Sequence, residues 1–401
     1  MPSEINSGWN ISSERRDWYR QKSKSSAERK RKAKGNVPSV AKRKHVLDNS
    51  QNMPHLSEAP IDCVSLFSGC GGLDIGFERA GFGHIFAADI LEICAETLSK
   101  NRPQWSVFGG ETDGDVQKTD WLKVKEKHQQ EFLVVHGGPP CQPFSNSGKQ
   151  RGKDDPRDMV PEFFRAVSDL QPDAFCMENV PALGNVKFSN YLDEQVQRKL
   201  GNSYHWRKFY MFAPHFGVPQ RRERLFVVGF KSKPCFDRFE IPKPTHRITK
   251  FSGEANRSLK KFLSIYDKLP DIRDLPQTMG VRQAIGLDNE FPDGLAPTFR
   301  SGFTGPRNST SILNGASSQR VFAEMGIWGN GVAPSIADAE AFIPENGHTR
   351  LSVADCALIQ GFPSNWEICG PVYKAIGQIG NSVAPPVAYA VAKAIKEALM
   401  Q

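Results

Sequence analysis

The sequence predicts an α/β protein with a doubly wound, mainly parallel sheet and a smaller, irregular second domain. Two observations carry this prediction. Short apolar runs alternate with segments of roughly ten residues that have helical spacing, which is typical of a parallel sheet. Between residues 241 and 350 this alternation stops, and Gly, Pro, Ser, Thr, Asn and Arg dominate.

The first apolar run, Ile61–Phe67, has the length of a buried strand and ends in a glycine loop. Leu73–Ala80 then follows with helical spacing. The later elements repeat this order. Strands are expected at His84–Ile90, Glu131–His136, Ala174–Val180, Tyr204–Phe212 and Leu225–Phe230, the last two as an edge pair, and helices at Leu91–Asn101, Asp158–Leu170 and Ser382–Leu399.

The N-terminal arm, residues 1–58, differs from the rest in charge. Residues 1–60 hold 13 Lys and Arg against 6 Asp and Glu, whereas the whole chain has a net charge of +8. The arm lacks apolar periodicity, which predicts disorder, although a short helix over Ser13–Lys30 stays open. Its basic clusters, Arg29–Lys34 and Lys42–Lys44, attract polyanions, and a solvated tail without a partner fits them equally well.

Some classes are disfavoured by what the sequence lacks. It has no apolar run long enough to span a membrane and no secretory signal, so a cytoplasmic protein is expected. Its eight cysteines show no CxxC spacing and no accompanying His pair, so no metal site is predicted. The default for such cysteines is a buried free thiol.

The loop Phe67–Gly72 (FSGCGG) lies where the first strand ends, and doubly wound sheets bind ligands at the carboxyl ends of their strands. Glycines let the backbone approach a ligand closely, and the following helix N-terminus favours a carboxylate. Asp89 ends the next strand and is placed to accept hydrogen bonds from a ribose. The spacing lacks the third glycine of GxGxxG, which disfavours a nicotinamide cofactor. A role in packing alone remains the alternative for these glycines.

Three further motifs carry reactive side chains. Cys141, in PPCQP, sits on a proline-stiffened loop directly after a strand, where a thiol can be aimed as a nucleophile. Glu178, in MENV, ends an apolar strand, and such burial raises a carboxyl pKa and favours a proton-holding role. Arg222 and Arg224, in QRRER, are expected on one face, where they can bind a carbonyl oxygen, a phosphate or the cysteine loop. Taken singly, an incidental cysteine, a structural acid and solvent-facing arginines remain alternatives.

The order of the motifs is more specific than any one of them. FSGCGG, PPCQPFS, MENV, QRRER, RLSVADCALIQGFP and QIGNSVAPP follow one another along the chain. This series closely resembles the DNA (cytosine-5) methyltransferase family of prokaryotic restriction–modification systems. The resemblance covers residues 61–240 and 350–401, is looser across 241–350, and is absent from 1–58. It implies a Rossmann-like, S-adenosylmethionine-dependent methyltransferase sheet.

The resemblance implies a domain plan and a set of site residues. Residues 59–240 and 351–401 form the catalytic domain, and residues 241–350 form the target-recognition domain. The catalytic residues are Cys141 as nucleophile, Glu178 against the Watson–Crick edge of cytosine, and Arg222 and Arg224 near the base and the cysteine loop. The S-adenosylmethionine site comprises Phe67, Ser68, Gly69, Cys70, Gly71, Gly72, Asp89, Ile90, Asp115, Val116, Pro140, Asn381, Ser382 and Val383.

The implied reaction adds Cys141 to C6 of cytosine, which makes C5 electron-rich enough to accept the methyl group. The target atom is inside the duplex, so the base must be flipped out. In the target-recognition domain, Arg300, Arg307 and Arg320 are candidates for contacts with guanine edges or phosphates. The implied partner is double-stranded DNA, with a cognate restriction endonuclease acting separately, and the chain is expected to be a monomer associated with the nucleoid.

Three other functions remain open at this point. A branch of the family that modifies tRNA shares these motifs, although the 110-residue insert favours DNA. A DNA-binding relative without activity is disfavoured by the intact Cys141 and Glu178. A nicotinamide-linked oxidoreductase is disfavoured by the glycine spacing.

Overall fold

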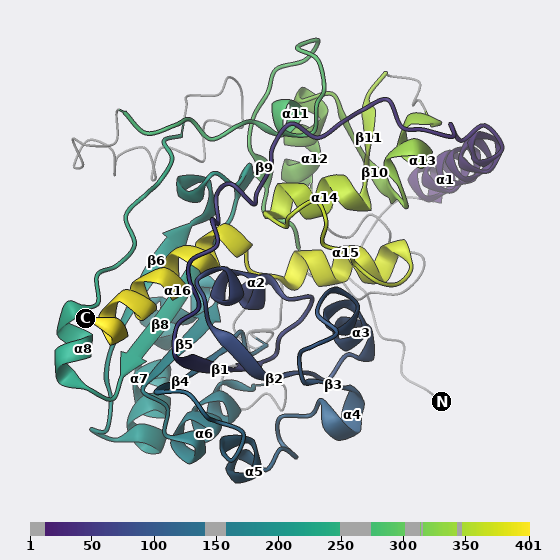
Figure 1. The fold of residues 1–401 in the computed structure, drawn as a ribbon. Coiled ribbons are helices and arrows are strands. Elements are labelled where there is room, and N and C mark those ends of the chain that lie inside the picture. Colours follow the sequence, from purple (N-terminus) through teal and green to yellow (C-terminus); the bar gives the residue numbers. More distant parts are fainter. Residues whose placement is uncertain (1–12, 141–157, 249–273, 301–312, 314–315, 343–346) are drawn as a thin grey trace, which may run out of the picture.

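The computed structural model describes residues 13–140, 158–248, 274–300, 313, 316–342 and 347–401. Its central sheet has seven strands in the order β3-β2-β1-β4-β5-β8-β6 (Figure 1). The strands are β1 (Ile61–Leu66), β2 (Gly83–Asp89), β3 (Val107–Gly109), β4 (Phe132–Gly137), β5 (Ala174–Asn179), β6 (His205–Phe212) and β8 (Glu223–Phe230).

Strands β3, β2, β1, β4 and β5 run parallel, whereas β8 lies antiparallel between β5 and β6. The predicted parallel sheet with a pair of strands at its edge is therefore confirmed, and the antiparallel direction of β8 is a finding of the structure. Short β3 was not predicted, since its three residues are only half-buried and leave no apolar run. The parallel order brings the carboxyl ends of β1, β2, β4 and β5 to one edge of the sheet.

Helices cover both faces of the sheet. On one face α2 (Gly72–Arg79), α3 (Glu92–Asn101) and α16 (Pro385–Met400) pack over the inward side chains of one core cluster. On the other lie α5 (Trp121–Lys125), α6 (Val160–Leu170) and α7 (Val186–Leu200). The terminal helix, predicted from Ser382, has its two prolines Pro385 and Pro386 in its predicted first turns, where they could interrupt it. They instead begin the helix, because proline lacks only an N–H that the first turn leaves unpaired anyway.

The chain between β8 and the C-terminal helices builds small elements above the sheet (Figure 1). After α8 (Lys233–Arg238), β9 (Ala296–Pro297) pairs with β7 (Gln220–Arg221), and β10 (Ile327–Ala333) pairs in parallel with β11 (Thr349–Ser352). The helices here are α11 (Val281–Ala284), α12 (Ala316–Glu324) and α13 (Ile336–Glu340), followed by α14 (Val353–Gln360) and α15 (Val372–Asn381). Strand β11 crosses the predicted boundary between residues 350 and 351, so the domain limits stay a prediction.

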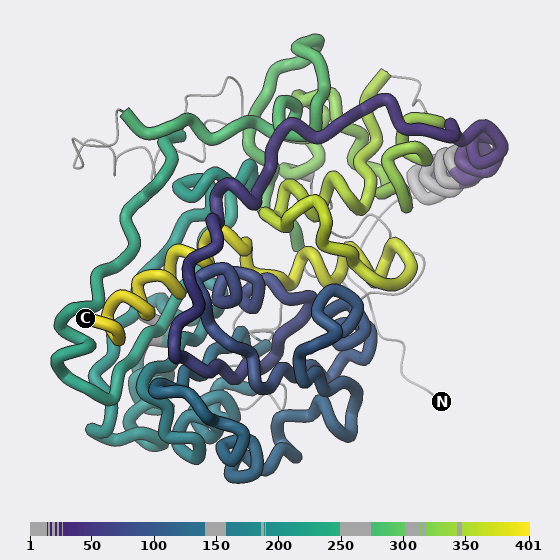
Figure 2. The backbone as a smooth tube through the Cα atoms, viewed as in Figure 1, coloured from purple at the N-terminus to yellow at the C-terminus, as the bar shows by residue number. Residues whose placement is uncertain are grey.

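The N-terminal segment differs from the disordered arm that its composition predicts. Residues Ser13–Lys34 form α1, and the following stretch runs across the molecule to β1 (Figure 2). Within it Leu47, Asn49 and Met53 are buried, and Asn49 Nδ2 donates to the carbonyls of Leu358 and Phe362 at 2.9 and 3.0 Å. These isolated buried residues have no periodicity, so the sequence could not reveal the packing.

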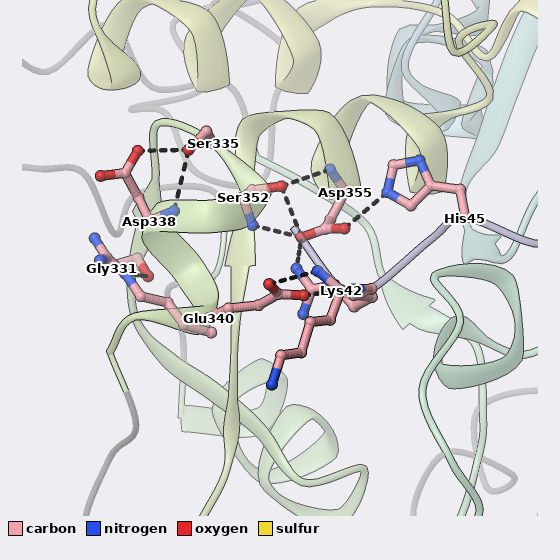
Figure 3. A network of polar contacts seen from close by, with 10 residues as sticks. Lys42, His45, Gly331, Ser335, Asp338, Glu340, Ser352 and Asp355 are labelled. Carbon is pink, nitrogen blue, oxygen red and sulfur yellow. Dashed lines mark hydrogen bonds and ion pairs between the residues drawn. The ribbon is translucent and has the colours of Figure 1, made fainter. Parts of the chain in front are cut away.

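Polar contacts fix the same segment (Figure 3). The backbone N–H groups of Lys42 and Arg43 donate to the Glu340 carboxylate at 2.9 and 2.6 Å. Asp355 Oδ2 lies 2.5 Å from Arg43 Nη2, and Asp355 Oδ1 lies 2.9 Å from His45 Nε2. The same Asp355 forms a capping box with Ser352 at the start of α14. The segment is thus tied to both α13 and α14.

Candidate active site

The glycine loop joins β1 to α2 with a strained backbone. Phe67 has φ 55°, a left-handed value that is rare for a non-glycine residue, and Gly69 and Gly71 have φ 56° and 91°. Strain of this kind persists where the surrounding structure enforces it, and it concentrates at functional sites. A side chain added at Gly69 would meet no atom of the described residues within 4 Å, so among these residues the backbone of the loop borders open space.

Asp89, at the end of β2, holds this loop in place. Its Oδ2 accepts from Gly69 N and its Oδ1 from Leu91 N, both at 2.8 Å. Burial raises the pKa of Asp89, and these hydrogen bonds partly oppose that rise. The adjacent Ile90 is a large apolar side chain with an exposed fraction of 50%. An acid fixed beside an exposed apolar side chain and an open glycine backbone suits an adenosine group.

Asp115 and Val116 follow β3, whose Gly109 pairs with Asp89. Asp115 is half-buried, accepts from Gln117 N at 3.1 Å and lies 3.5 Å from Lys118 Nζ. Val116 is buried, and its carbonyl accepts from Arg165 Nη2 at 2.7 Å. The pairing of Gly109 with Asp89 places the start of this loop beside the end of β2, where Asp115 and Val116 are expected.

Residues 381–383 return to the glycine loop from the far end of the sequence. Asn381 is exposed, whereas Ser382 and Val383 are buried. A side chain added at Gly72 would lie 2.0 Å from Ser382 Oγ and 2.4 Å from the Val383 carbonyl oxygen, so only glycine permits this approach. The structure therefore brings together the first and last motifs of the series.

Glu178 ends β5 and forms an ion pair with Arg224, its Oε1 lying 2.8 Å from Arg224 Nε. Burial raises the pKa of Glu178, while Arg224 and then Arg222 oppose the rise. A side chain added at Gly138 would come within 3.1 Å of Glu178 Oε2, which places this carboxylate beside the loop that leads to residue 141. Cys141 itself lies outside the described residues.

Arg222 is buried, with an exposed fraction of 1%. Its guanidinium donates to the carbonyls of Phe299 (3.2 Å), Gly380 (3.1 Å) and Ser382 (2.5 Å). A carbonyl oxygen is one of the partners that the sequence predicts for it. Arg222 thus joins the start of β8 to the end of α15, while it still acts electrostatically on Glu178.

Three residues of the site were missed by sequence analysis. Asn179 Nδ2 donates to the Pro139 carbonyl at 3.1 Å and so anchors the start of the proline loop; Pro140, the next residue, is exposed. Gln360 Nε2 donates to the Ser382 carbonyl at 2.6 Å, and Trp366 Nε1 donates to the Cys70 carbonyl at 2.9 Å. All three lie within or just after quoted motifs, but which backbone carbonyls they reach depends on the fold.

Two of the three arginines proposed for DNA contacts lie among the described residues. Arg300 is exposed at the end of a described stretch, and Arg320 is exposed on α12. Arg307 lies outside the described residues. Their roles therefore stay a prediction. Among the described helices, none is both long and apolar enough to cross a bilayer.

The fold and site define an α/β protein with a glycine loop at the carboxyl edge of its parallel strands and a buried acid near the end of a neighbouring strand. Comparison with known proteins gives the family. The model of the C-5 cytosine-specific DNA methylase family matches residues 61–397. The chain belongs to this family and is a DNA cytosine methyltransferase.

Relatives agree with this assignment, and solved structures share the fold. The chain is 32% identical over 339 residues to the type II methyltransferase M.NgoMIV of Neisseria gonorrhoeae, covering 84% of this chain and 97% of the relative. It is 35% identical to M.AquIA of Picosynechococcus over 55% of this chain and 92% of that relative. A DNA modification methyltransferase from an Escherichia coli prophage has a similar fold, with a TM-score of 0.54, 21% identity, and coverage of 85% of this chain and all of that one. A DNMT2 mutant of Spodoptera frugiperda has a TM-score of 0.53, 17% identity, and coverage of 83% and 99%.

Proposed function

We propose that the chain transfers a methyl group from S-adenosylmethionine to C5 of cytosine within one specific sequence of double-stranded DNA, through a covalent adduct with Cys141. The observation that carries the residue assignment is the place of Glu178. This buried acid is paired with Arg224 and lies beside the glycine that begins the loop of Cys141.

The cofactor site fits S-adenosylmethionine. The open backbone at Gly69 and the N-terminus of α2 suit the methionine part, and Ile90, Asp115 and Val116 suit the adenine. Asp89 holds the loop through one oxygen and retains lone pairs for a ribose hydroxyl. Phe67, Ser68, Cys70, Gly71, Gly72, Pro140, Asn381, Ser382 and Val383 would complete this site. When bound, the sulfonium supplies an electrophilic methyl group.

The chain's own residues prepare the cytosine. Sγ of Cys141 bonds to C6, and the electrons of the C5–C6 double bond shift so that C5 becomes nucleophilic. Glu178, whose pKa is raised by burial, donates a proton or a hydrogen bond to N3 and accepts from the exocyclic amine. Arg224 keeps this carboxyl group oriented. After methylation, C5 loses its proton, the C6–S bond breaks, and the thiolate and the aromatic ring are restored.

The biological setting is proposed from the relatives. Both named relatives are type II methyltransferases. We therefore infer that this chain protects DNA against a separate restriction endonuclease with the same target sequence, acting as a monomer in the cytoplasm. Residues 241–350 would read the target, with Arg300, Arg307 and Arg320 as candidate contacts.

Bisulfite sequencing of DNA from cells that express the chain tests the proposal. The expected result is methylated cytosine at one position of a recurrent short sequence, absent from cells that express Cys141→Ala. Labelled S-adenosylmethionine with purified enzyme and either duplex DNA or tRNA gives the second arm. Transfer to tRNA alone, or undiminished transfer by Cys141→Ala, would contradict the proposal.

A further inference from the structure

Three potential metal ligands meet beside the central sheet, and a buried carboxylate lies next to them. Cys63 on β1, His84 on β2 and His136 on β4 come from three neighbouring strands, and their ligand atoms all lie within 4.8 Å of one another. Asp74, in the first turn of α2, lies over them, with Oδ1 3.6 Å from His84 Nε2. His84 Nε2 and His136 Nε2 are 3.3 Å apart. All four side chains are buried.

Hydrogen bonds alone do not satisfy this cluster. Both carboxylate oxygens of Asp74 lack a hydrogen bond in the described part of the chain, as does Nδ1 of each histidine. His84 Nε2 faces both His136 Nε2 and Asp74 Oδ1, and one proton on it cannot serve both. Buried polar groups of native proteins nearly always have partners, so a buried carboxylate without a hydrogen bond beside two facing Nε2 atoms indicates a bound ion or water.

We infer that Cys63, His84 and His136 bind a zinc-class divalent metal ion, with the buried carboxylate of Asp74 beside it. Zinc prefers thiolate sulfur, imidazole nitrogen and carboxylate oxygen in tetrahedral geometry. Metal–ligand bonds of about 2.0–2.3 Å give ligand–ligand separations of roughly 3.3–3.6 Å. The two Nε2 atoms are 3.3 Å apart and the ligand atoms of all three residues lie within 4.8 Å of one another, so small side-chain shifts would complete the site.

The site is structural in kind, because its side chains are buried and give a substrate no access. It joins three neighbouring strands next to the first turn of α2. The sequence predicts no metal because the ligands come from separate elements and have no recognisable spacing. The rings are also packed, His84 against Trp105 (4.0 Å between centroids) and His136 against Phe77 (4.2 Å), which limits their rotation.

Metal analysis of the untagged, full-length protein tests the inference. After growth with added zinc and dialysis, an equimolar amount of zinc is expected in the wild type and in the control Cys356→Ser, which removes another buried thiol. The double variant Cys63→Ser, His136→Gln should lose it. A metal-free wild type, or full retention by the double variant, would overturn the inference.

Cobalt spectroscopy keeps the test decisive if the double variant does not fold. Metal-free Cys141→Ser protein, which lacks the proposed nucleophilic thiol, should bind Co²⁺ with tetrahedral visible bands and a thiolate-to-cobalt charge-transfer band. The charge-transfer band alone should vanish in Cys63→Ser. Absence of the band before that substitution would show that the cluster holds protons or water instead.

Discussion

Substitution of Arg222 by lysine separates a positioning role from direct contact with the base. The guanidinium donates to three buried carbonyls, those of Phe299, Gly380 and Ser382, at 2.5–3.2 Å. A lysine ammonium keeps the charge but cannot span all three acceptors from one point. If two of these hydrogen bonds are lost, at about 1.5–3 kcal/mol for each charged donor, the free energy of unfolding should fall by about 3–6 kcal/mol.

Urea unfolding measures this loss directly. The midpoint should fall while the m-value stays unchanged, because the same surface is exposed on unfolding. Arg300→Lys, at an exposed position, is the matched control and should leave the midpoint where it is. Since the Ser382 carbonyl is one of the acceptors and Ser382 packs on Gly72, KM for the methyl donor should rise more than kcat falls.

The opposite pattern would refute this reasoning. If Arg222→Lys unfolds at the wild-type urea concentration but loses turnover at unchanged KM, the guanidinium acts on the base in the transition state. The hypothesis drawn from the sequence motif would then be the better one.

Three further results are expected. Glu178→Gln should lower kcat by about 10²–10⁴-fold. In the wild type, kcat should also decline as rising pH removes the Glu178 proton, and the variant should lack this decline. The same pH profile in both proteins would exclude Glu178 as the proton donor. Asp355→Asn keeps a side-chain oxygen for the cap of α14 but breaks the buried pairing with Arg43 and His45, so urea unfolding should show that the free energy of unfolding falls by about 3–5 kcal/mol. A fall no larger than that for an exposed ion pair would mean that the N-terminal segment is not held there. In metal-free protein burial raises the pKa of Asp74 from 3.8 to about 7, which favours folding at low pH, and this contribution is lost as pH rises towards 7. Chemical unfolding across that range should therefore show a falling free energy of unfolding in the wild type and a flatter dependence in Asp74→Asn. Parallel falls in both proteins would contradict the assignment.

The sequence revealed those parts of the fold that depend on local pattern. The strand of Ile61 and its neighbours are apolar runs because both faces of a parallel sheet are covered by helices. Asp89 and the glycine loop were found for a related reason. Their positions at strand ends are visible in the chain, and strand ends of a parallel sheet meet at one edge.

Contacts between distant segments were beyond the sequence. Arg222 reaches carbonyls 77, 158 and 160 residues away, and a basic residue at the start of a strand gives no sign of those acceptors. The segment around Asn49 was expected to be disordered because a few scattered buried side chains produce no periodicity. Its stability comes from specific pairings with Asp355 and with the end of α14.

These distant contacts form one connected path between the N-terminal segment and the cofactor loop. Arg43 and Asn49 bind α14, Gln360 at the end of that helix donates to the Ser382 carbonyl, and Ser382 packs on Gly72. Such a path transmits a change only if one of its elements has a second stable arrangement. Here every member is buried and hydrogen-bonded, so the path should act as a rigid support. Loss of the Asp355 pairing should therefore reduce the stability of the enzyme without changing KM for the methyl donor, whereas a joint change in both would mean that α14 can adopt another position.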